Sequence, residues 1–281
     1  MTPVYKKLAL ATAALALFGA TVTLPGLIQL DTVAQADVPA SLAGTVDVGD
    51  CSYSLVKLAG AKSTDKALIL TAGHCIRGLA AADVMVDSPF TESGNPQVLD
   101  ANGNAVTGVH RIKVLYATRS GTDMALYQAA ETYGQLSAKR AAVLELSSEH
   151  PAAGTEIFLP SSFHRRSFEC AIDGFVHQLK EGDRTWNDSI RYTTACKTEP
   201  GASGSPIVDK ATGKVVGVHN TGNNGGRCTD DNPCEVDANG TVKVDKGRKY
   251  GQQTFQVYGC LGEGSTIDLT KSGCTLAKPK Q

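Results

Sequence analysis

Three short motifs hold the residues of this chain that are best suited to nucleophilic chemistry. In chain order they place His74 in Thr-Ala-Gly-His-Cys, Asp123 in Thr-Asp-Met-Ala-Leu and Ser203 in Gly-Ala-Ser-Gly-Ser-Pro. A serine hydroxyl is a weak nucleophile near neutral pH, so it needs an adjacent base and a third group that orients the base. Histidine suits the base because its ordinary pKa lies near neutrality, and a buried carboxylate suits the orienting group. We therefore predict a catalytic triad of His74, Asp123 and Ser203.

The residues around Ser203 favour an exposed hydroxyl beside a pair of backbone donors. Small neighbours on both sides let the chain turn sharply there. Gly201 lies two residues before the serine. Its N–H and that of Ser203 are the groups we expect to stabilise negative charge on a substrate carbonyl oxygen, as an oxyanion hole.

The segment Cys-Ser-Tyr-Ser-Leu that begins at Cys51, followed by the motif around His74, resembles chymotrypsin-like (trypsin-fold) serine peptidases. The chain order His, Asp, Ser is also the order of that family. The resemblance spans roughly residues 42–260. It implies an all-β fold of two six-stranded antiparallel β-barrels with the active site between them. His74 and Asp123 would lie on the first barrel and Ser203 on the second, with a disulfide between Cys51 and Cys75.

Two departures from the pancreatic members concern activation. Ala202 stands before Ser203 where those members carry Asp, and no Ile-Val-Gly-Gly start follows a basic residue. A new N-terminal ammonium would therefore find no buried carboxylate beside Ser203. We expect no activation by that salt bridge.

The resemblance implies a serine endopeptidase that hydrolyses peptide bonds through an acyl-enzyme, with protein or peptide substrates and no cofactor. Two other classes stay open, because fold alone does not establish activity. One is a catalytically inactive binding protein on the same fold. The other is an esterase that uses the same three residues.

Two residues near Ser203 bear on substrate specificity. Thr198 lies five residues before it and His219 sixteen residues after it. This looks similar to the secreted bacterial glutamyl endopeptidases, where a Thr and a His in these places hold an acidic P1 side chain. A hydroxyl and an imidazole can both donate to a carboxylate, and we expect His219 to do so best when protonated. The alternative is that His219 simply ends a strand.

Two further features lie near the same place. Lys197 could add positive charge, and Asn220, Thr221 and Gly222 follow His219 directly. A short extended segment beside a nucleophile can pair with a peptide backbone as an added strand. We expect these three residues to form that edge.

The N-terminus reads as a secretory signal. Lys6 and Lys7 precede an apolar run from Leu8 to about Leu24, and Ala-Gln-Ala ends at residue 36. We predict that residues 1–36 are a signal peptide and that the mature protein is extracellular. An uncleaved anchor is the alternative, but the run is short for a membrane span.

Eight cysteines all follow this segment. An even count in a secreted chain indicates disulfides, although eight cysteines allow 105 connectivities. No Cys-x-x-Cys pair is present, so we expect no metal site. Beyond the pair implied by the resemblance, Cys170 and Cys196 would face each other across a hairpin that turns near residue 183. The short-loop neighbours are Cys228 with Cys234 and Cys260 with Cys274.

Composition and patterning agree with an all-β chain. The net charge of −1 and the lack of a basic stripe argue against nucleic-acid binding. The sequence has no second apolar run that would indicate a membrane span. We expect a monomer, with one barrel in 37–143 and the second, carrying a disulfide-rich extension, in 144–281. A helix is expected over 135–143. The expected strands are 44–48, 52–58, 67–71, 83–86, 109–116, 124–128, 155–159, 169–179, 189–194, 215–219 and 250–258.

The polar stretch 228–249 contains Asp-Ala-Asn-Gly at 237–240, a turn signal between two alternating segments. A calcium loop built from Asp230, Asp231 and Asp237 is the alternative. Because the EF-hand spacing is absent, we predict a hairpin.

Overall fold

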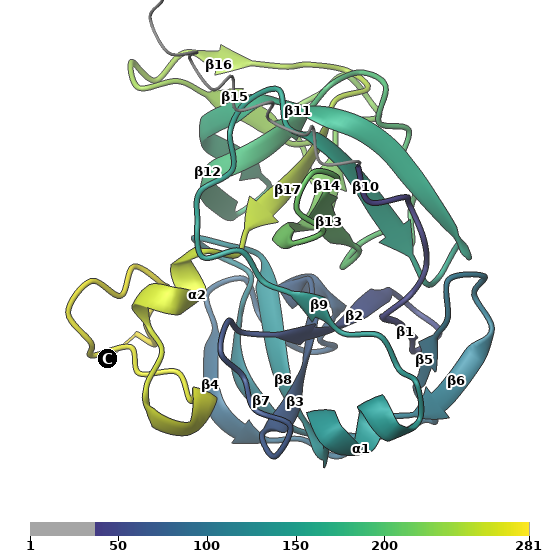
Figure 1. The fold of residues 1–281 in the computed structure, drawn as a ribbon. Coiled ribbons are helices and arrows are strands. Elements are labelled where there is room, and N and C mark those ends of the chain that lie inside the picture. The colour runs from purple at the N-terminus through teal and green to yellow at the C-terminus, as the bar shows by residue number, and fades with distance from the viewer. Residues whose placement is uncertain (1–36, 281) are drawn as a thin grey trace, which may run out of the picture. The chain divides into compact units, whose positions relative to one another are not determined.

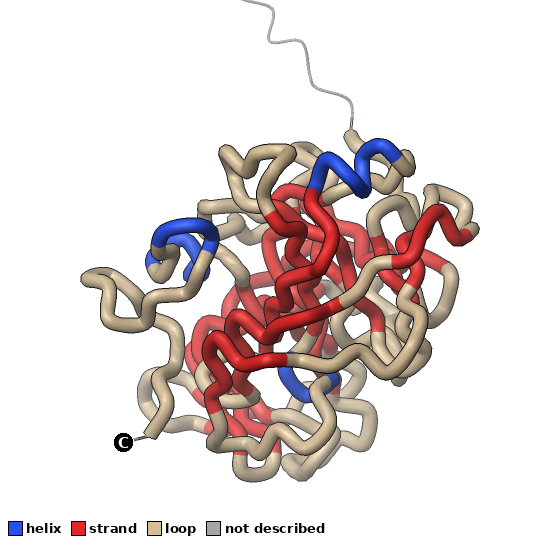
Figure 2. The backbone as a smooth tube through the Cα atoms, turned by 90° about the horizontal axis from the view of Figure 1, so that it is seen from below, coloured by secondary structure: helices blue, strands red, loops and turns tan. Residues whose placement is uncertain are grey.

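A computed structural model describes residues 37–280, and the predicted signal peptide lies outside them. Strands make up most of the regular secondary structure in this part of the chain, and its helices are short (Figure 2). The strands form two sheets, which are labelled β1–β9 and β10–β17 in Figure 1. The all-β class is confirmed. No helix of the described residues has the length and apolarity needed to cross a membrane.

The first sheet runs in the order β4-β7-β8-β3-β2-β1-β5-β6, and β9 adds to β2. All of its pairings are antiparallel except β2 with β9. It therefore contains more than the six strands expected. Its strands are β1 (Thr45–Asp47), β2 (Ser52–Lys57), β3 (Lys66–Thr71), β4 (Val84–Pro89), β5 (Gln97–Leu99), β6 (Ala105–Gly108), β7 (Arg111–Thr118), β8 (Met124–Thr132) and β9 (Leu144–Glu145).

The second sheet closes on itself, because β10 pairs with both β13 and β11. The ring β10-β13-β14-β17-β12-β11 is the expected six-stranded barrel, and β15 and β16 extend it from β11. Its strands are β10 (Glu156–Ser161), β11 (Arg166–Glu181), β12 (Arg184–Tyr192), β13 (Pro206–Asp209), β14 (Val215–Gly222), β15 (Cys234–Val236), β16 (Val242–Lys243) and β17 (Lys249–Gln253).

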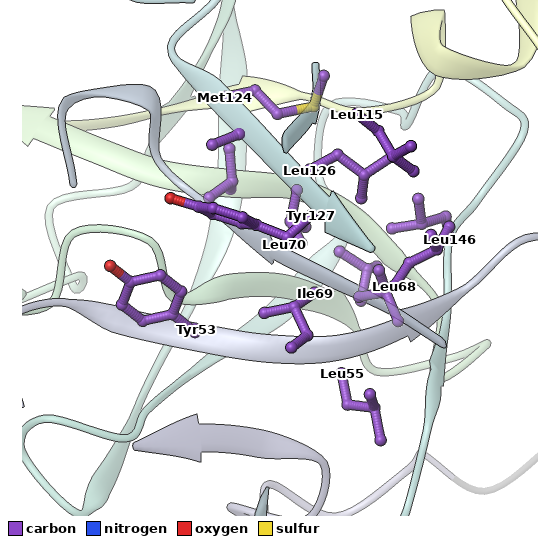
Figure 3. Packing of buried hydrophobic residues seen from close by; sticks show 14 of the residues in the cluster. Tyr53, Leu55, Leu68, Ile69, Leu70, Leu115, Met124, Leu126, Tyr127 and Leu146 are labelled. Carbon is purple, nitrogen blue, oxygen red and sulfur yellow. The ribbon is translucent and has the colours of Figure 1, made fainter. Parts of the chain in front are cut away.

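The core of the first sheet fixes the strands that carry the site. Strands β2 and β3 and the first half of β8 are buried almost throughout, and their apolar side chains share one core. Figure 3 shows Leu55, Leu68 and Leu70 packed with Leu126 and Tyr127. Burying a side chain of this kind contributes about 1.5–3 kcal/mol relative to leaving it exposed. This packing holds the end of β3 and the start of β8 side by side.

The long hairpin of β11 and β12 reaches from the second sheet to the first. It turns at Gly182, whose φ of +57° is a conformation that glycine adopts readily. Beyond the turn, the Trp186 indole N–H donates to the Arg119 carbonyl at 2.8 Å, and Gly121 N–H donates to the Thr185 carbonyl. The hairpin therefore ties the second sheet to the loop that precedes Asp123.

Helical segments are few in the described chain: η1 (Gly73–Cys75), α1 (Tyr133–Ala138), α2 (Gln256–Gly259) and η2 (Glu263–Ser265). The helix expected over 135–143 begins and ends earlier, because Thr132 and Gln135 form a capping box at its start. The strand expected over 250–258 was wrong beyond Gln253, where α2 forms instead. The alternation of apolar residues there did not distinguish a strand from a helical turn.

Two boundaries differ from the expectation for the two barrels. Strand β9 belongs to the first sheet, so that sheet ends at Glu145. From α2 onward the chain turns back to the first sheet, where Val257, Cys260 and Leu276 join its core. The C-terminal extension thus follows the second barrel in sequence but packs on the first (Figure 1).

Four disulfides are present, and they join the cysteines in the expected pairs: Cys51–Cys75, Cys170–Cys196, Cys228–Cys234 and Cys260–Cys274. The polar stretch near the last strands forms the predicted hairpin, in which β15 pairs with β16. Asp237 accepts the N–H groups of Asn239 and Thr241 in its turn. Asp230 forms an ion pair with Arg184 instead of facing Asp237.

Candidate active site

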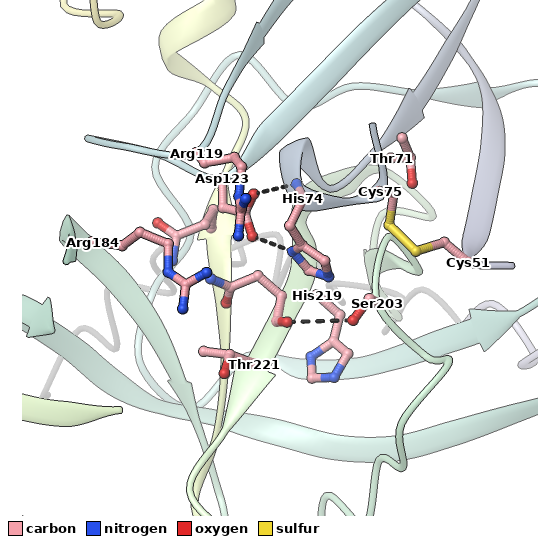
Figure 4. A network of polar contacts seen from close by, with 12 residues as sticks. Cys51, Thr71, His74, Cys75, Arg119, Asp123, Arg184, Ser203, His219 and Thr221 are labelled. Atoms are coloured by element: carbon pink, nitrogen blue, oxygen red, sulfur yellow. Dashed lines mark hydrogen bonds and ion pairs between the residues drawn. A yellow bond between two sulfur atoms is a disulfide. The ribbon is translucent and has the colours of Figure 1, made fainter. Parts of the chain in front are cut away.

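The structure brings His74 and Asp123 together at the facing ends of β3 and β8. The His74 N–H donates to Asp123 Oδ1 at 2.8 Å, and the ring Nδ1 lies 2.6 Å from Oδ2 (Figure 4). Gly73 allows this approach, because a Cβ there would overlap the Thr118 carbonyl. With its proton on Nδ1, the ring presents the Nε2 lone pair to the cavity, as a general base requires.

The electrostatics of the pair follow from burial and charge. Asp123, directly before β8, is 1% exposed. Burial alone would lower the pKa of His74, but the charge of Asp123 and its hydrogen bond raise that pKa above the ordinary histidine value. The carboxylate therefore stabilises an imidazolium at this position.

Ser203 lies in the loop between β12 and β13, and the backbone of both sheets clamps this loop. Its carbonyl accepts the Ser52 N–H at 2.8 Å, and the next N–H, of Gly204, donates to the His219 carbonyl at 2.8 Å. Gly204 has a φ of +82°, and a Cβ there would overlap the Ser52 carbonyl oxygen and Thr71 Oγ1. Only glycine fits at position 204, where the Ser203 loop lies against β2 and β3.

The Ser203 hydroxyl donates to the Asn220 carbonyl at 3.4 Å. Within the described residues it makes no hydrogen bond to His74, although both side chains line the same cavity. Hydrogen bonds of this kind are often long in the absence of substrate and tighten when it binds.

Two backbone donors stand free beside Ser203. Gly201 has a φ of +96°, and the chain folds back there with the Ala202 N–H on the Glu199 carbonyl at 3.0 Å. Across residues 37–280, neither the Gly201 N–H nor the Ser203 N–H donates to a protein acceptor. Two unpaired backbone N–H groups beside a hydroxyl are what an oxyanion hole needs.

All three predicted triad residues open onto one cavity of about 420 Å³. One wall is the segment before Ser203, and the other is the end of β14. The tip of the β11–β12 hairpin and the start of β17 complete it. The lining residues are His74, Arg119, Asp123, Glu181, Arg184, Trp186, Thr198, Glu199, Pro200, Gly201, Ser203, His219, Asn220, Thr221, Gly222, Asn224, Asp231 and Lys249.

The cavity contains every predicted substrate-binding residue but not the expected cation. His219 is 4% exposed, and its Nδ1 donates to the Tyr250 carbonyl at 3.0 Å. Burial, with a smaller effect of Lys249, lowers the pKa of His219 to about 3. His219 is therefore neutral near pH 7 in the pocket without substrate, and its binding of an acidic side chain stays a prediction. Lys197 is exposed and does not line it.

The other predicted residues differ in what they offer. Thr198 is buried, and its Oγ1 has no hydrogen-bond partner in the described chain. Strand β13 pairs with β14 only as far as Val218. Beyond the His219 N–H, which donates to the Ser205 carbonyl, that edge of β14 runs unpaired over 220–222 within residues 37–280.

Sequence reasoning missed half of the lining residues, among them Glu181, Arg184 and Lys249. Glu181 accepts hydrogen bonds from Thr221 and from Arg184, and burial raises the pKa of its carboxyl. None of the three lies in a motif. The hairpin lengths of β11–β12 and the pairing of β14 with β17 bring them to the site, and no local signal could have found them.

Residues 59–218 match the family model for the trypsin-like peptidase domain, which is more than half of the chain. The chain belongs to this family, as its resemblance had indicated. No curated protein matches it.

Solved structures that are similar to the chain are proteases of low sequence identity. The MamO protease domain from Magnetospirillum magneticum is 13% identical, with 79% of this chain and 98% of that chain covered and a TM-score of 0.48. A Glu endopeptidase is 17% identical, with 75% of this chain and 85% of that chain covered and a TM-score of 0.43. Protease Anisep from Arthrobacter nicotinovorans is 17% identical, with 78% of this chain and 92% of that chain covered and a TM-score of 0.42. At these values the likeness says nothing about this chain's substrate.

Proposed function

We propose that this protein is a secreted serine endopeptidase in which Ser203 is the nucleophile, His74 the general base and Asp123 the group that orients the base. The observation that carries the proposal is the pair of His74 with the buried Asp123, at 2.6 Å, on the same cavity as Ser203 and two free backbone N–H groups. Members of the trypsin-like peptidase family are hydrolases of this kind, which supports the assignment.

The first half of the reaction forms an acyl-enzyme. Ser203 Oγ attacks the carbonyl carbon of the scissile peptide while His74 Nε2 takes the hydroxyl proton. The carbonyl oxygen becomes an anion between the N–H groups of Gly201 and Ser203, which donate to no protein acceptor in residues 37–280. The tetrahedral intermediate collapses when the protonated His74 gives its proton to the leaving amine, and the carbon–nitrogen bond breaks.

The second half repeats the steps with water. His74 removes a proton from a water molecule, and the resulting hydroxide attacks the acyl carbon. The carbon–oxygen bond to Ser203 breaks, and His74 returns the proton to the serine. In both halves Asp123 holds the Nδ1 proton and stabilises the transient imidazolium.

Two features support the substrate class and the compartment. The unpaired edge of β14 over 220–222 offers backbone groups to an extended peptide. Four disulfides use all eight cysteines, a pattern of proteins in oxidising compartments. This agrees with the signal peptide predicted for residues 1–36.

The test compares the mature wild type with Ser203→Ala on unstructured peptides and on matched esters. We expect peptide hydrolysis by the wild type and a loss of about 10⁶-fold in the variant. Ester turnover without peptide turnover would make the protein an esterase. No turnover of either substrate would favour a binding protein on this fold.

A further inference from the structure

Lys249 is a buried cation in the wall of the cavity. It begins β17, directly opposite Gly222 of β14 in the sheet register. Its side chain lies across Gly222, because a Cβ on that glycine would overlap Lys249 Cδ and stand 3.0 Å from Nζ. The residue is 9% exposed. The ammonium therefore lies where the end of β14 faces the cavity.

The charge of Lys249 is not matched by a carboxylate. Its Nζ donates to Asn224 Oδ1 at 2.6 Å, and it forms no ion pair with any Asp or Glu of residues 37–280. Burial, followed by repulsion from Lys197, lowers the pKa of Lys249, and the attraction of Glu199, which forms no ion pair with it, only partly offsets this. Taking a charge out of water without a counter-ion is costly. An anion that enters the cavity would remove this cost.

The other charged groups that line the cavity are mostly paired. Arg184 forms ion pairs with Glu181 at 3.1 Å and with Asp230 at 2.7 Å. Glu199 forms an ion pair with Arg166 at 2.9 Å. Asp123 is bound to His74, and Asp231 is exposed.

Arg119 also lacks a carboxylate partner within the described residues, but it lies beside Asp123 on the first sheet (Figure 4). On the side of the second sheet, the cavity lies between the segment before Ser203 and the end of β14. Among the described residues that line this side, Lys249 is the cation without an ion pair.

This side of the cavity is where the P1 side chain must go. When the scissile carbonyl oxygen sits between the N–H groups of Gly201 and Ser203, the P1 residue lies between the segment 198–201 and the strand end 220–222. The Thr198 hydroxyl, buried and without a partner, lines the same space. A carboxylate there would accept from that hydroxyl and from the ammonium of Lys249.

We propose that Lys249, with Thr198, selects an acidic P1 side chain, Asp or Glu, in the peptide hydrolysis proposed above. The inference rests on that function. The neutral His219 closes the pocket beside them, and its Nε2 lone pair does not attract an anion. A basic P1 side chain would meet the uncompensated ammonium and be rejected.

The experiment measures kcat/KM for peptides that differ only at P1, with Glu, Gln and Arg, on the wild type and on Lys249→Gln and Lys249→Glu. Lys246→Gln is the matched control, because Lys246 is exposed, lies three residues away and does not line the cavity. We expect the wild type to favour Glu over Gln by about 10- to 100-fold, the size of a charge-assisted hydrogen bond.

In Lys249→Gln this ratio should fall to about threefold or less, and Lys249→Glu should favour Arg. Lys246→Gln should keep the wild-type ratio. A wild type without acidic preference overturns the proposal whether or not the variants fold, and so does a Lys249→Gln enzyme that keeps the ratio. A preference lost on Lys197→Gln instead would assign the role to Lys197. These failures are distinct from failure of the proposed function, in which the wild type cleaves none of the peptides.

Discussion

Asp123 holds His74 at two points, since one carboxylate oxygen accepts the backbone N–H at 2.8 Å and the other faces the ring Nδ1 at 2.6 Å. The backbone bond fixes the position of the residue, and the ring bond fixes its orientation and its tautomer. One carboxylate therefore determines where the Nε2 lone pair points.

Replacing Asp123 by Asn should keep the shape of the site but reverse the tautomer, because an amide N–H aimed at Nδ1 moves the imidazole proton to Nε2. We expect kcat to fall about 10⁴-fold with little change in the melting temperature. Asp83→Asn, at an exposed loop position, is the control and should leave kcat unchanged. Equal losses in both variants, or a loss of less than about tenfold in Asp123→Asn, would remove Asp123 from the mechanism.

The acidic limb of the profile of kcat/KM against pH should follow the protonation of His74. The base must be neutral to accept a proton, so kcat/KM should rise with pH through the pKa of His74. Asp123 raises that pKa above the usual histidine value near 6.5. We therefore expect the midpoint for a P1 Ala peptide, whose side chain does not titrate, to lie above 6.5. A midpoint well below that value would mean that another group controls the reaction.

The burial of His219 should make stability depend on pH in the opposite sense from His74. Because its folded pKa of about 3 lies below the unfolded value near 6.5, the unfolded chain binds more protons in this window. Its contribution is fully present above about pH 6.5 and is lost as the pH falls toward 3. His74, with a raised pKa, contributes stability that is lost as the pH rises.

Urea unfolding at pH 7 and at pH 4 tests this account of His219. The free energy of unfolding of the wild type should drop more than that of His219→Gln, by about 2–4 kcal/mol. The exposed His177→Gln is the control and should follow the wild type. An identical drop in wild type and His219→Gln would mean that His219 is charged in the folded state at pH 4.

The close contact of Gly204 with Ser52 and Thr71 can be tested by comparison with Gly154, a glycine of similar backbone conformation that has no such contact. Their φ angles are +82° and +85°, but a Cβ at Gly154 would meet nothing within 4 Å. Gly154→Ala should cost only the backbone strain, about 1–2 kcal/mol. Gly204→Ala should cost about 2 kcal/mol more and should lower kcat, since the serine must shift. Equal costs in thermal unfolding would show that the loop is not clamped.

The parts of the site that the sequence could predict are those that local chemistry demands. His74, Asp123 and Ser203 lie in motifs whose small neighbours have physical reasons, such as the space that Gly73 and Gly204 leave for backbone. The all-β class followed from many short apolar segments broken by turns. The disulfides followed from short loops, a hairpin and the resemblance.

What could not be predicted depends on register and burial. Lys249 reaches the cavity only because β17 pairs with β14 at Gly222, far away in sequence. His219 has the residue type of a carboxylate ligand, yet its surroundings keep it neutral. The helix α2 replaced an expected strand because the chain leaves the second barrel there to pack on the first. Each of these outcomes is set by tertiary packing.

The most direct test of the central claim is reaction of the mature protein with a fluorophosphonate, followed by mass spectrometry of the modified peptide. The account predicts one covalent adduct per chain, located on Ser203. Labelling should be absent in Ser203→Ala and slowed by at least about 10³-fold in His74→Ala. An unmodified wild type, or an adduct on any other residue, would contradict the assignment of Ser203 as an activated nucleophile.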